Sequence, residues 1–295
     1  MQLQMQVPGA IDPHAFKSEV REQWDRSATG WDAHTPAIRG WLAQATAAMV
    51  EMAGVREGAR VLDVAAGAGD QTLDIARRIG PHGFVLATDL SPAMVELAAQ
   101  RAAHAGMPQV ATSQADGEAL DIEPASFDAA VCRLGLMLFP QPLQGLREMH
   151  RALRPGGGIC TLVFSRAERN PCLGVLMSTA RAHAGLPPGD PYQPGGLLSL
   201  GQPGLADRLF REAGFADVAS TIVDAPFRLP SAAHYLQFVR DSASPIQGIL
   251  ARLSPAAADA AWTEMEQRLA VFATADGWTG PNELLLTAGR RPPNH

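Results

Sequence analysis

Hydrophobic runs and amphipathic stretches alternate along this chain from Arg60 onward, and this alternation constrains the fold more than any other feature. The short apolar runs have the length of buried strands, and the stretches between them have the spacing of helices. Strands that alternate with helices form a parallel sheet with helices on both faces. The pattern therefore predicts an α/β protein with a Rossmann-like sheet.

The predicted elements follow one another in a regular order. Strands are expected at residues 60–65, 84–89, 110–115, 127–133, 159–164, 218–223 and 283–288. Helices between them are expected at residues 70–79, 92–104, 142–153 and 205–213. Ser91 before Pro92 is typical of a helix start, and Gly214 is typical of a helix end. Residues 154–158 are expected to form a turn, because proline and glycine end a helix.

Two stretches do not fit the alternation: residues 165–204, rich in proline and glycine, and residues 226–281, expected to be mostly helical. Both follow the carboxyl end of a strand, where ligands bind in open α/β sheets. Together with a helix expected near residues 15–32, these two stretches are predicted to form a lid. The alternative is that their helices only thicken the domain. The chain is expected to divide into an N-terminal lid segment (1–50), the core (51–164) and a lid insertion (165–204). A core helix and strand (205–225), a helical cap (226–281) and the last strand with its tail (282–295) follow.

Charge and composition disfavour several classes of partner. The formal net charge is -6, so the chain has no overall positive field for a nucleic-acid backbone. Residues 1–16 have neither a basic start nor an apolar run, and no stretch reaches the ~20 apolar residues that span a bilayer. We therefore expect a cytoplasmic protein without a membrane span. The oligomeric state stays open, a homodimer included.

The three cysteines, Cys132, Cys160 and Cys172, are odd in number and lack Cys-x-x-Cys spacing. This usage fits a reducing compartment and predicts neither a zinc site nor any other metal site. Buried structural thiols are the expected role.

The segment 61–70, Val-Leu-Asp-Val-Ala-Ala-Gly-Ala-Gly-Asp, has the strongest functional signal. It places Asp63 at the end of a buried strand, and Gly67 and Gly69 in the turn before a helix. Such glycines let a ligand approach the backbone closely. The spacing differs from the dinucleotide pattern GxGxxG, because no third glycine follows.

Two further acids follow neighbouring strands. Asp89 ends the second strand, where a carboxylate can accept protons from both hydroxyls of a ribose. Asp116 follows the third strand and is expected at the same edge of the sheet. A single Asp after a strand is more commonly a turn former or helix cap, so the prediction depends on the set.

In this order the motifs resemble the class I S-adenosylmethionine (SAM)-dependent methyltransferases, within them the branch of the ubiquinone and menaquinone biosynthesis C-methyltransferases. The resemblance covers residues 58–164. Besides segment 61–70, the matching motifs are Ala-Thr-Asp-Leu-Ser-Pro-Ala-Met, Gln-Ala-Asp-Gly-Glu-Ala-Leu, Phe-Asp-Ala-Ala-Val-Cys-Arg and Leu-Arg-Pro-Gly-Gly, at 87–94, 114–120, 127–133 and 153–157.

The resemblance implies SAM as cofactor, S-adenosylhomocysteine as product, and a seven-stranded, mostly parallel sheet whose last strand is antiparallel. It implies that Asp63, Ala65 and Gly67, in the loop that also holds Gly69, surround the methionine part of SAM, and that Asp89 binds the ribose. The remaining cofactor contacts that it implies are Leu90 and Met94 at the border, Asp116, Gly117 and Glu118 along the adenine, and Arg133 and Leu134 beside the sulfonium. Ala65 departs from the family, which has glycine there.

The segment 24–32 resembles the part of these enzymes that closes over SAM. Trp31 stands where the family more often has tyrosine, and packing of Trp31 on the core is the alternative.

Methyl transfer from SAM is an in-line displacement, so alignment and exclusion of water are the main tasks of the enzyme. A hydroxyl, amine or acidic carbon can also need a general base. The candidates in the lid are His234, Tyr235 and His183, with His34 and Tyr192 as further options. A surface or structural role remains the alternative for each of them.

The acceptor is expected to be a small molecule: a phenolic, quinone-like or other lipophilic metabolite. Apolar lid residues could line its pocket or form the core of the cap, namely Met177, Leu197, Leu198, Phe227, Leu236, Phe238 and Trp262. A DNA or protein amide acceptor is disfavoured, because Arg133-Leu134-Gly135-Leu136 replaces the Asn/Asp-Pro-Pro-aromatic motif of those enzymes. An oxidoreductase would need the third glycine and a Tyr-x-x-x-Lys pair, both absent. A non-catalytic SAM-fold binding or scaffold protein remains the alternative.

Overall fold

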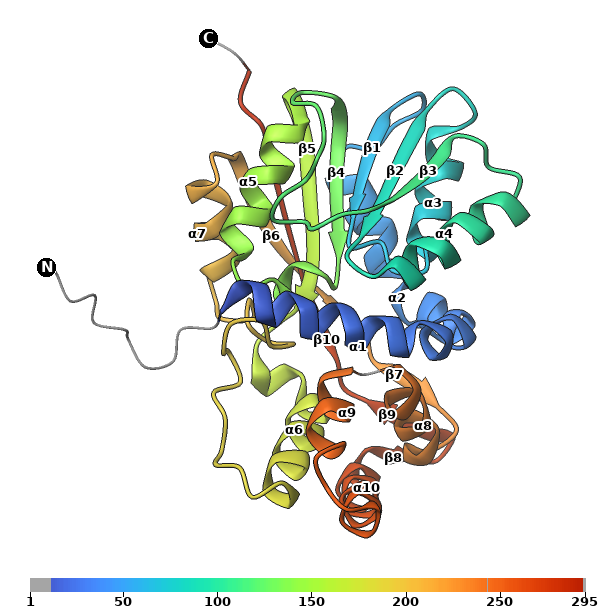
Figure 1. Cartoon of the computed structure of the whole chain (residues 1–295), viewed down its shortest axis with the longest axis vertical. Coiled ribbons are helices and arrows are strands. Elements are labelled where there is room, and N and C mark those ends of the chain that lie inside the picture. The colour runs from blue at the N-terminus through green and yellow to red at the C-terminus, as the bar shows by residue number, and fades with distance from the viewer. Residues whose placement is uncertain (1–11, 243, 294–295) are drawn as a thin grey trace, which may run out of the picture.

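The structure is a computed structural model that describes residues 12–242 and 244–293. Its central strands are β1 (Arg60–Val64), β2 (Phe84–Asp89), β3 (Val110–Gln114), β4 (Phe127–Arg133), β5 (Leu153–Phe164), β6 (Ala216–Asp224) and β10 (Glu283–Arg290). They form one seven-stranded sheet in the order β3-β2-β1-β4-β5-β10-β6 (Figure 1). Only β10 runs antiparallel to its neighbours, β5 and β6. The predicted Rossmann-like sheet with an antiparallel last strand is confirmed.

Strand β5 differs from the prediction, because residues 154–158 continue the strand instead of forming a separate turn. The backbone N–H of Gly156 donates to the carbonyl of Arg291 at 2.8 Å, and Arg291 N–H donates to Gly157 O at 2.9 Å. The partner thus comes from the far end of the chain. Local composition, which favours a turn at proline and glycine, carries no information about this pairing.

Helices α2 (Thr35–Met52), α3 (Asp70–Ile79), α4 (Pro92–His104), α5 (Pro142–Ala152) and α7 (Leu205–Glu212) flank the sheet. Helix α4 begins at Ser91, whose side-chain oxygen accepts from Met94 N–H at 3.1 Å, as expected of a serine cap. Helix α2 lies within the segment predicted as lid, yet it packs against β5 and β10. Helix α2 thus packs on the sheet as the core helices do, and the sequence pattern did not show this packing.

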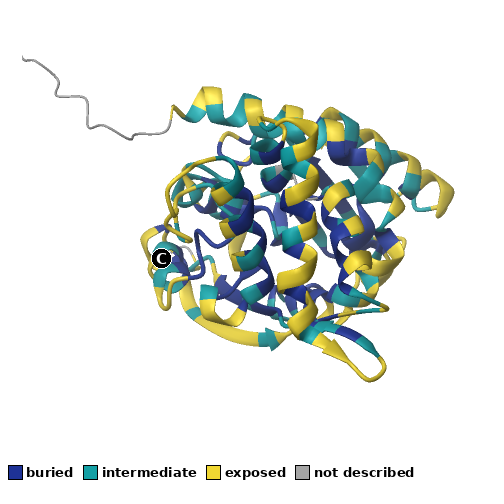
Figure 2. Ribbon diagram, turned by 90° about the horizontal axis from the view of Figure 1, so that it is seen from below, coloured by how far each residue is buried: buried dark blue, intermediate teal, exposed yellow. Residues whose placement is uncertain are grey.

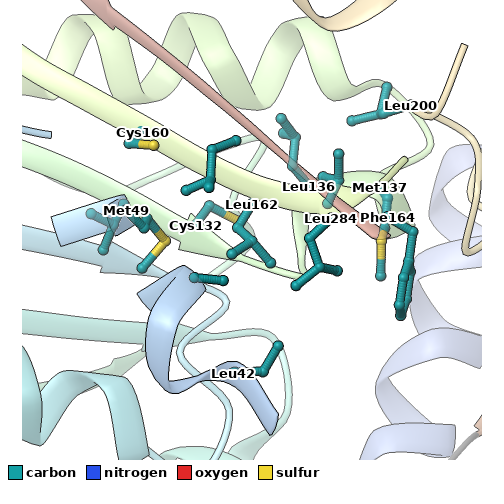
Figure 3. Close-up of a cluster of buried hydrophobic side chains, with 14 of the residues drawn as sticks. Leu42, Met49, Cys132, Leu136, Met137, Cys160, Leu162, Phe164, Leu200 and Leu284 are labelled. Carbon is teal, nitrogen blue, oxygen red and sulfur yellow. The ribbon is translucent and has the colours of Figure 1, made fainter. Parts of the chain in front are cut away.

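The core lies between the sheet and these helices. Leu42 and Met49 of α2 belong to the same buried cluster as Cys132, Cys160 and Leu162 of the sheet (Figure 3). Burying one such leucine or methionine stabilises the fold by about 1.5–3 kcal/mol. All three cysteines are buried and free, as expected of structural thiols.

Below the sheet lies a second layer that belongs to the lid and cap (Figure 1). Its helices are α1 (Pro13–Ala33), α6 (Pro171–His183), α8 (Ala232–Ser242), α9 (Ser244–Leu250) and α10 (Pro255–Leu269). Three-residue 3-10 turns occur at η1 (Leu136–Leu138), η2 (Ala167–Arg169) and η3 (Ala270–Phe272). The cap also contains a small sheet in the order β7-β9-β8, from β7 (Phe227–Leu229), β8 (Ala273–Thr274) and β9 (Gly277–Gly280), which the prediction of a mostly helical cap missed.

Helix α1 runs across the molecule between the sheet and the cap (Figure 1). It packs against α4 of the core and against α8 and α9 of the cap. In the view from below, exposed residues follow the outer helix faces while buried ones gather inside (Figure 2). None of the helices in residues 12–242 and 244–293 has both the length and the apolar character that a membrane crossing requires.

Candidate active site

A cavity opens where β1, β2 and β4 end and α1 covers them; we call it the strand-end cavity. Its wall on the sheet side comprises Ala65, Gly67, Asp89, Leu90, Met94, Ala115, Asp116, Gly117, Arg133, Leu134, Gly135, Leu138, Phe139 and Pro140. Helix α1 contributes Phe16, Lys17, Val20, Trp24 and Trp31. The structure thus brings ten of the thirteen predicted cofactor residues to one cavity.

The loop after β1 shapes the cavity floor. Gly67 has a φ of 58°, a conformation that glycine adopts at low cost, and Ala65 also has a positive φ of 55°. A Cβ atom on Gly135 would lie 2.3 Å from the Cβ of Ala65. The alanine at the family's glycine position is therefore accommodated because residue 135 is itself glycine, a compensation that sequence analysis missed.

Asp89 points its carboxylate into this loop. One oxygen accepts the Gly67 N–H and the other accepts the Ser91 N–H, each at 2.9 Å. Burial raises the pKa of Asp89, while the hydrogen bonds from the Ser91 and Gly67 backbone counteract that effect. Each carboxylate oxygen can accept a further hydrogen bond, so the group suits two neighbouring hydroxyls.

Three predicted cofactor residues do not line the strand-end cavity: Asp63, Gly69 and Glu118. Asp63 is fully buried and accepts hydrogen bonds from Thr72 Oγ1 at 2.6 Å and Gln71 Nε2 at 3.3 Å. Burial raises the pKa of Asp63 to about 7. Gly69 precedes α3 with a φ of 79°, close to the Cβ of Ala98.

Arg133 enters the cavity already paired. Its guanidinium lies 2.5 Å from the Asp70 carboxylate and donates to Thr46 Oγ1 at 3.0 Å. Both charged side chains are buried, so the carboxylate offsets the positive charge inside the protein. A cationic group in this cavity would therefore meet an arginine whose charge is already offset by Asp70.

Lys17 is a site residue that sequence analysis missed. Its ammonium contacts Asp116 Oδ2 and Glu118 Oε2, both at 2.6 Å, and so joins α1 to the loop after β3. Burial lowers the pKa of Lys17, but the hydrogen bonds to Asp116 and Glu118 outweigh it and the pKa is raised. Lys17 is the only lysine of the chain, a signal that could have marked it.

A second cavity adjoins the first and is almost wholly apolar; we call it the apolar cavity. It shares Trp24, Trp31, Leu134 and Leu138 with the strand-end cavity. The other lining residues are Trp41, Met137, Phe164, Leu173, Leu176, Leu197, Phe227, Tyr235, Phe238, Val239, Ser242, Pro245, Ile246 and Asn282. The lid and cap supply most of this wall.

The three predicted catalytic residues are not brought together. Tyr235 lines the apolar cavity and stacks on Trp278, with 5.0 Å between the ring centroids. Burial raises the pKa of its hydroxyl, so the hydroxyl stays protonated and is not available as a general base. His234 is exposed and bonds Ser231 Oγ at 2.8 Å at the start of α8. His183 lies 2.9 Å from Glu264 and joins α6 to α10 outside both cavities.

Comparison with known proteins identifies the core. Residues 40–176 match the model of the ubiE/COQ5 methyltransferase family. This core is similar to the members of that family. The ubiquinone/menaquinone biosynthesis C-methyltransferase of Hahella chejuensis is 39% identical over 118 residues, which cover 40% of this chain and 47% of that protein. The chain spans about half the length of the first curated relatives that it matches.

Solved structures share the fold over most of the chain. The [4+2]-cyclase SpnF covers 94% of this chain and is itself covered to 97%, with a TM-score of 0.58 and 20% identity. Phosphoethanolamine N-methyltransferase 2 of Haemonchus contortus, solved with S-adenosylhomocysteine, covers 92% of this chain and is covered to 60%, with a TM-score of 0.57 and 18% identity. At such low sequence identities, the structural similarity shows a shared fold alone, and one fold can host more than one reaction.

The residues of the strand-end cavity fit SAM, the cofactor of this methyltransferase family. Asp89 offers two acceptor oxygens to the ribose hydroxyls, and Gly67 allows close approach to the backbone. The sulfonium would meet Arg133, whose positive charge is offset by Asp70 behind it. The adenine can lie near Asp116, which is half-buried and already partnered by Lys17.

Proposed function

We propose that this chain transfers the methyl group of SAM to an apolar small-molecule acceptor. One observation carries the proposal: a cavity with ribose-binding chemistry opens directly beside an apolar cavity, and the two share Trp24, Trp31, Leu134 and Leu138. A methyl donor in the first cavity would face an acceptor in the second. Binding both molecules in line provides the alignment that this displacement needs.

When bound, SAM supplies an electrophilic methyl group on a positive sulfur. The chain's part is to orient and to exclude water: Asp89 would bind the ribose hydroxyls, and the Gly67 backbone would border the amino-acid part. Trp24 and Trp31 of α1 would cover the reacting atoms, because they line both cavities. Closure of this kind keeps water away from the displacement.

The chemistry of the apolar cavity supports an acceptor that is nucleophilic without a strong base. Among its described lining residues, Tyr235 is the only one with a titratable side chain, and its pKa is raised by burial. A phenolic or quinone-like ring ionises or enolises more readily than an alkyl alcohol. We therefore propose a phenolic, quinone-like or other lipophilic acceptor, in agreement with the quinone pathway named for the curated relatives.

Titration calorimetry with SAM and S-adenosylhomocysteine tests the cofactor site first. Asp89→Ala should weaken SAM binding by about 10- to 100-fold, because it removes charge-assisted hydrogen bonds to the ribose. The exposed Asp259→Ala in α10 is the matched control and should bind SAM like the wild type. Equal SAM affinity of Asp89→Ala and wild type would refute this site.

A methyl-transfer assay with labelled SAM and a panel of phenols and quinols then tests the reaction. Transfer that depends on Asp89 supports the enzyme. If the folded protein binds neither SAM nor S-adenosylhomocysteine, the alternative of a non-catalytic scaffold on this fold takes its place.

A further inference from the structure

Asn282 lies in the wall of the apolar cavity, directly before β10, and its side-chain oxygen has no partner. The residue is 6% exposed, and within residues 12–242 and 244–293 no group donates a hydrogen bond to its Oδ1 atom. Buried amide oxygens are almost always paired in native proteins, because an unpaired one loses its contact with water without compensation. An unpaired oxygen at this position is therefore unusual for a residue that only supports the fold.

A second buried asparagine nearby makes the contrast clear. Asn170 is fully buried, and its Nδ2 donates to Ser165 Oγ at 3.2 Å and to the Glu283 carbonyl at 3.1 Å. Its Oδ1 accepts the Glu283 N–H at 3.0 Å. Asn170 thus holds the start of β10 in place. The Oδ1 of Asn282 makes no such contribution to the fold.

The backbone presents the Asn282 side chain from a fixed position. The Asn282 carbonyl accepts the Ala225 N–H at 2.9 Å, and the next residue, Glu283, is held by Asn170 and by Ser165. None of these contacts uses the Asn282 side chain. The backbone that carries this side chain is therefore held in place independently, so a rotation of the side chain alone can bring its oxygen to a ligand in the cavity.

The surroundings define the ligand chemistry. Seven aromatic side chains line the apolar cavity, Trp24, Trp31, Trp41, Phe164, Phe227, Tyr235 and Phe238. Such walls favour a flat ring. No carboxylate lines the cavity among the described residues, so a charged ammonium would be buried without a partner. A neutral O–H group on an aromatic ring satisfies both the walls and the Asn282 oxygen.

We propose that Asn282 is the specificity-determining residue of the acceptor site and accepts a hydrogen bond from an aromatic hydroxyl. Naming the bound molecule a methyl acceptor rests on the proposed function; the preference for an O–H donor does not. Asn282 lines the apolar cavity and not the strand-end cavity, so the hydroxyl it binds lies away from the methyl donor. The residue selects acceptors that carry this hydroxyl and rejects those in which it is capped.

Two probes test the proposal: 2-naphthol, which carries the O–H donor, and 2-methoxynaphthalene, in which a methyl group caps the same oxygen. Their binding to the full chain is followed by quenching of tryptophan fluorescence, with and without S-adenosylhomocysteine. Wild type should bind 2-naphthol about 3- to 10-fold more tightly than the ether, the usual net gain from one hydrogen bond. In Asn282→Leu the preference should disappear, because leucine keeps the size of the side chain without the oxygen.

Ser242→Ala is the matched control in the same wall, because its hydroxyl already donates to the Phe238 carbonyl. This variant should keep the preference for 2-naphthol, and circular dichroism should show that all three proteins are folded. Equal binding of both probes to wild type, failure of both to bind, or a preference that persists in Asn282→Leu would each overturn the proposal. Loss of SAM binding in a separate titration would reject the methyl-transfer function instead, and the probe preference would still be readable.

Discussion

Asp63 and Asp89 lie at the carboxyl ends of the neighbouring strands β1 and β2, Asp63 one residue before the last, yet their surroundings give them different roles. Asp89 lines the strand-end cavity and is half-buried, whereas Asp63 is fully enclosed and holds Thr72 and Gln71 at the start of α3. The family resemblance implied that Asp63 touches the cofactor. In this structure Asp63 stabilises the loop that carries Gly67, and Asp89 lines the strand-end cavity.

The titration of Asp63 leads to a prediction about stability. Its folded-state pKa of about 7 exceeds the ordinary aspartate pKa of 3.8, so the folded state binds the proton more tightly than the unfolded state does. The free energy of unfolding should therefore fall as pH rises between about 4 and 7, by on the order of 4 kcal/mol from this group, and stay level above. Urea titrations across this range should show that component in wild type and not in Asp63→Asn.

The exposed Asp259→Asn serves as control and should keep the wild-type pH dependence. An identical slope in Asp63→Asn and in wild type would show that the carboxyl of Asp63 is already ionised at low pH in the folded protein.

Helix α1 closes the strand-end cavity and is fastened at several points. Lys17 contacts Asp116 and Glu118, and the Ser91 hydroxyl donates to Asp25 at 2.5 Å. At its far end His34 lies 2.8 Å from Asp241 of α8. Because side chains of α1 form one wall of the cavity, we expect a shift of this helix to accompany binding and release of a cofactor.

Removing the Lys17 contacts should therefore change the kinetics of the cofactor. We expect Lys17→Met to speed dissociation of SAM by about 3- to 10-fold, because the partly buried ion pairs that hold α1 closed are lost. Stopped-flow tryptophan fluorescence measures this rate. Arg26→Ala is the matched control, since Arg26 and Glu22 form an exposed pair on the same helix. An unchanged dissociation rate in Lys17→Met would mean that these contacts do not hold α1 closed.

Over the whole molecule, sheet and cap share one hydrophobic core. The buried cluster that contains Leu162 and Leu284 of the large sheet (Figure 3) also contains Leu176, Met265 and Trp278 of the lid and cap. Packing that is continuous across elements couples their unfolding. The lid insertion and cap are thus structural parts of the same folding unit.

This continuity predicts a single cooperative unfolding transition. Far-ultraviolet circular dichroism reports the whole chain, and the fluorescence of a single-tryptophan variant that retains Trp278 reports the cap. Their urea transitions should coincide, because the cap cannot lose its packing while the sheet keeps the shared core. A cap transition at clearly lower urea would contradict a common core.

Much of the fold followed from local pattern. Apolar runs and helix signals predicted all seven strands of the large sheet, and glycines with the acids Asp89 and Asp116 marked its ligand-binding edge. These features can be predicted from the sequence because hydrophobic periodicity, helix caps and strand ends depend on neighbouring residues. The shared edge can be predicted because parallel strands bring their carboxyl ends together.

The sequence by itself thus determined the fold class, the place of the cofactor loop and the carboxylate that suits a ribose. Only the tertiary structure decided that Asp63 is enclosed, that Lys17 joins Asp116, that His234 is exposed, and that Asn282 lines an apolar cavity. Each of these outcomes depends on side chains from distant segments that meet in space. The burial and charge around a residue come from those partners, and local spacing along the chain does not specify them.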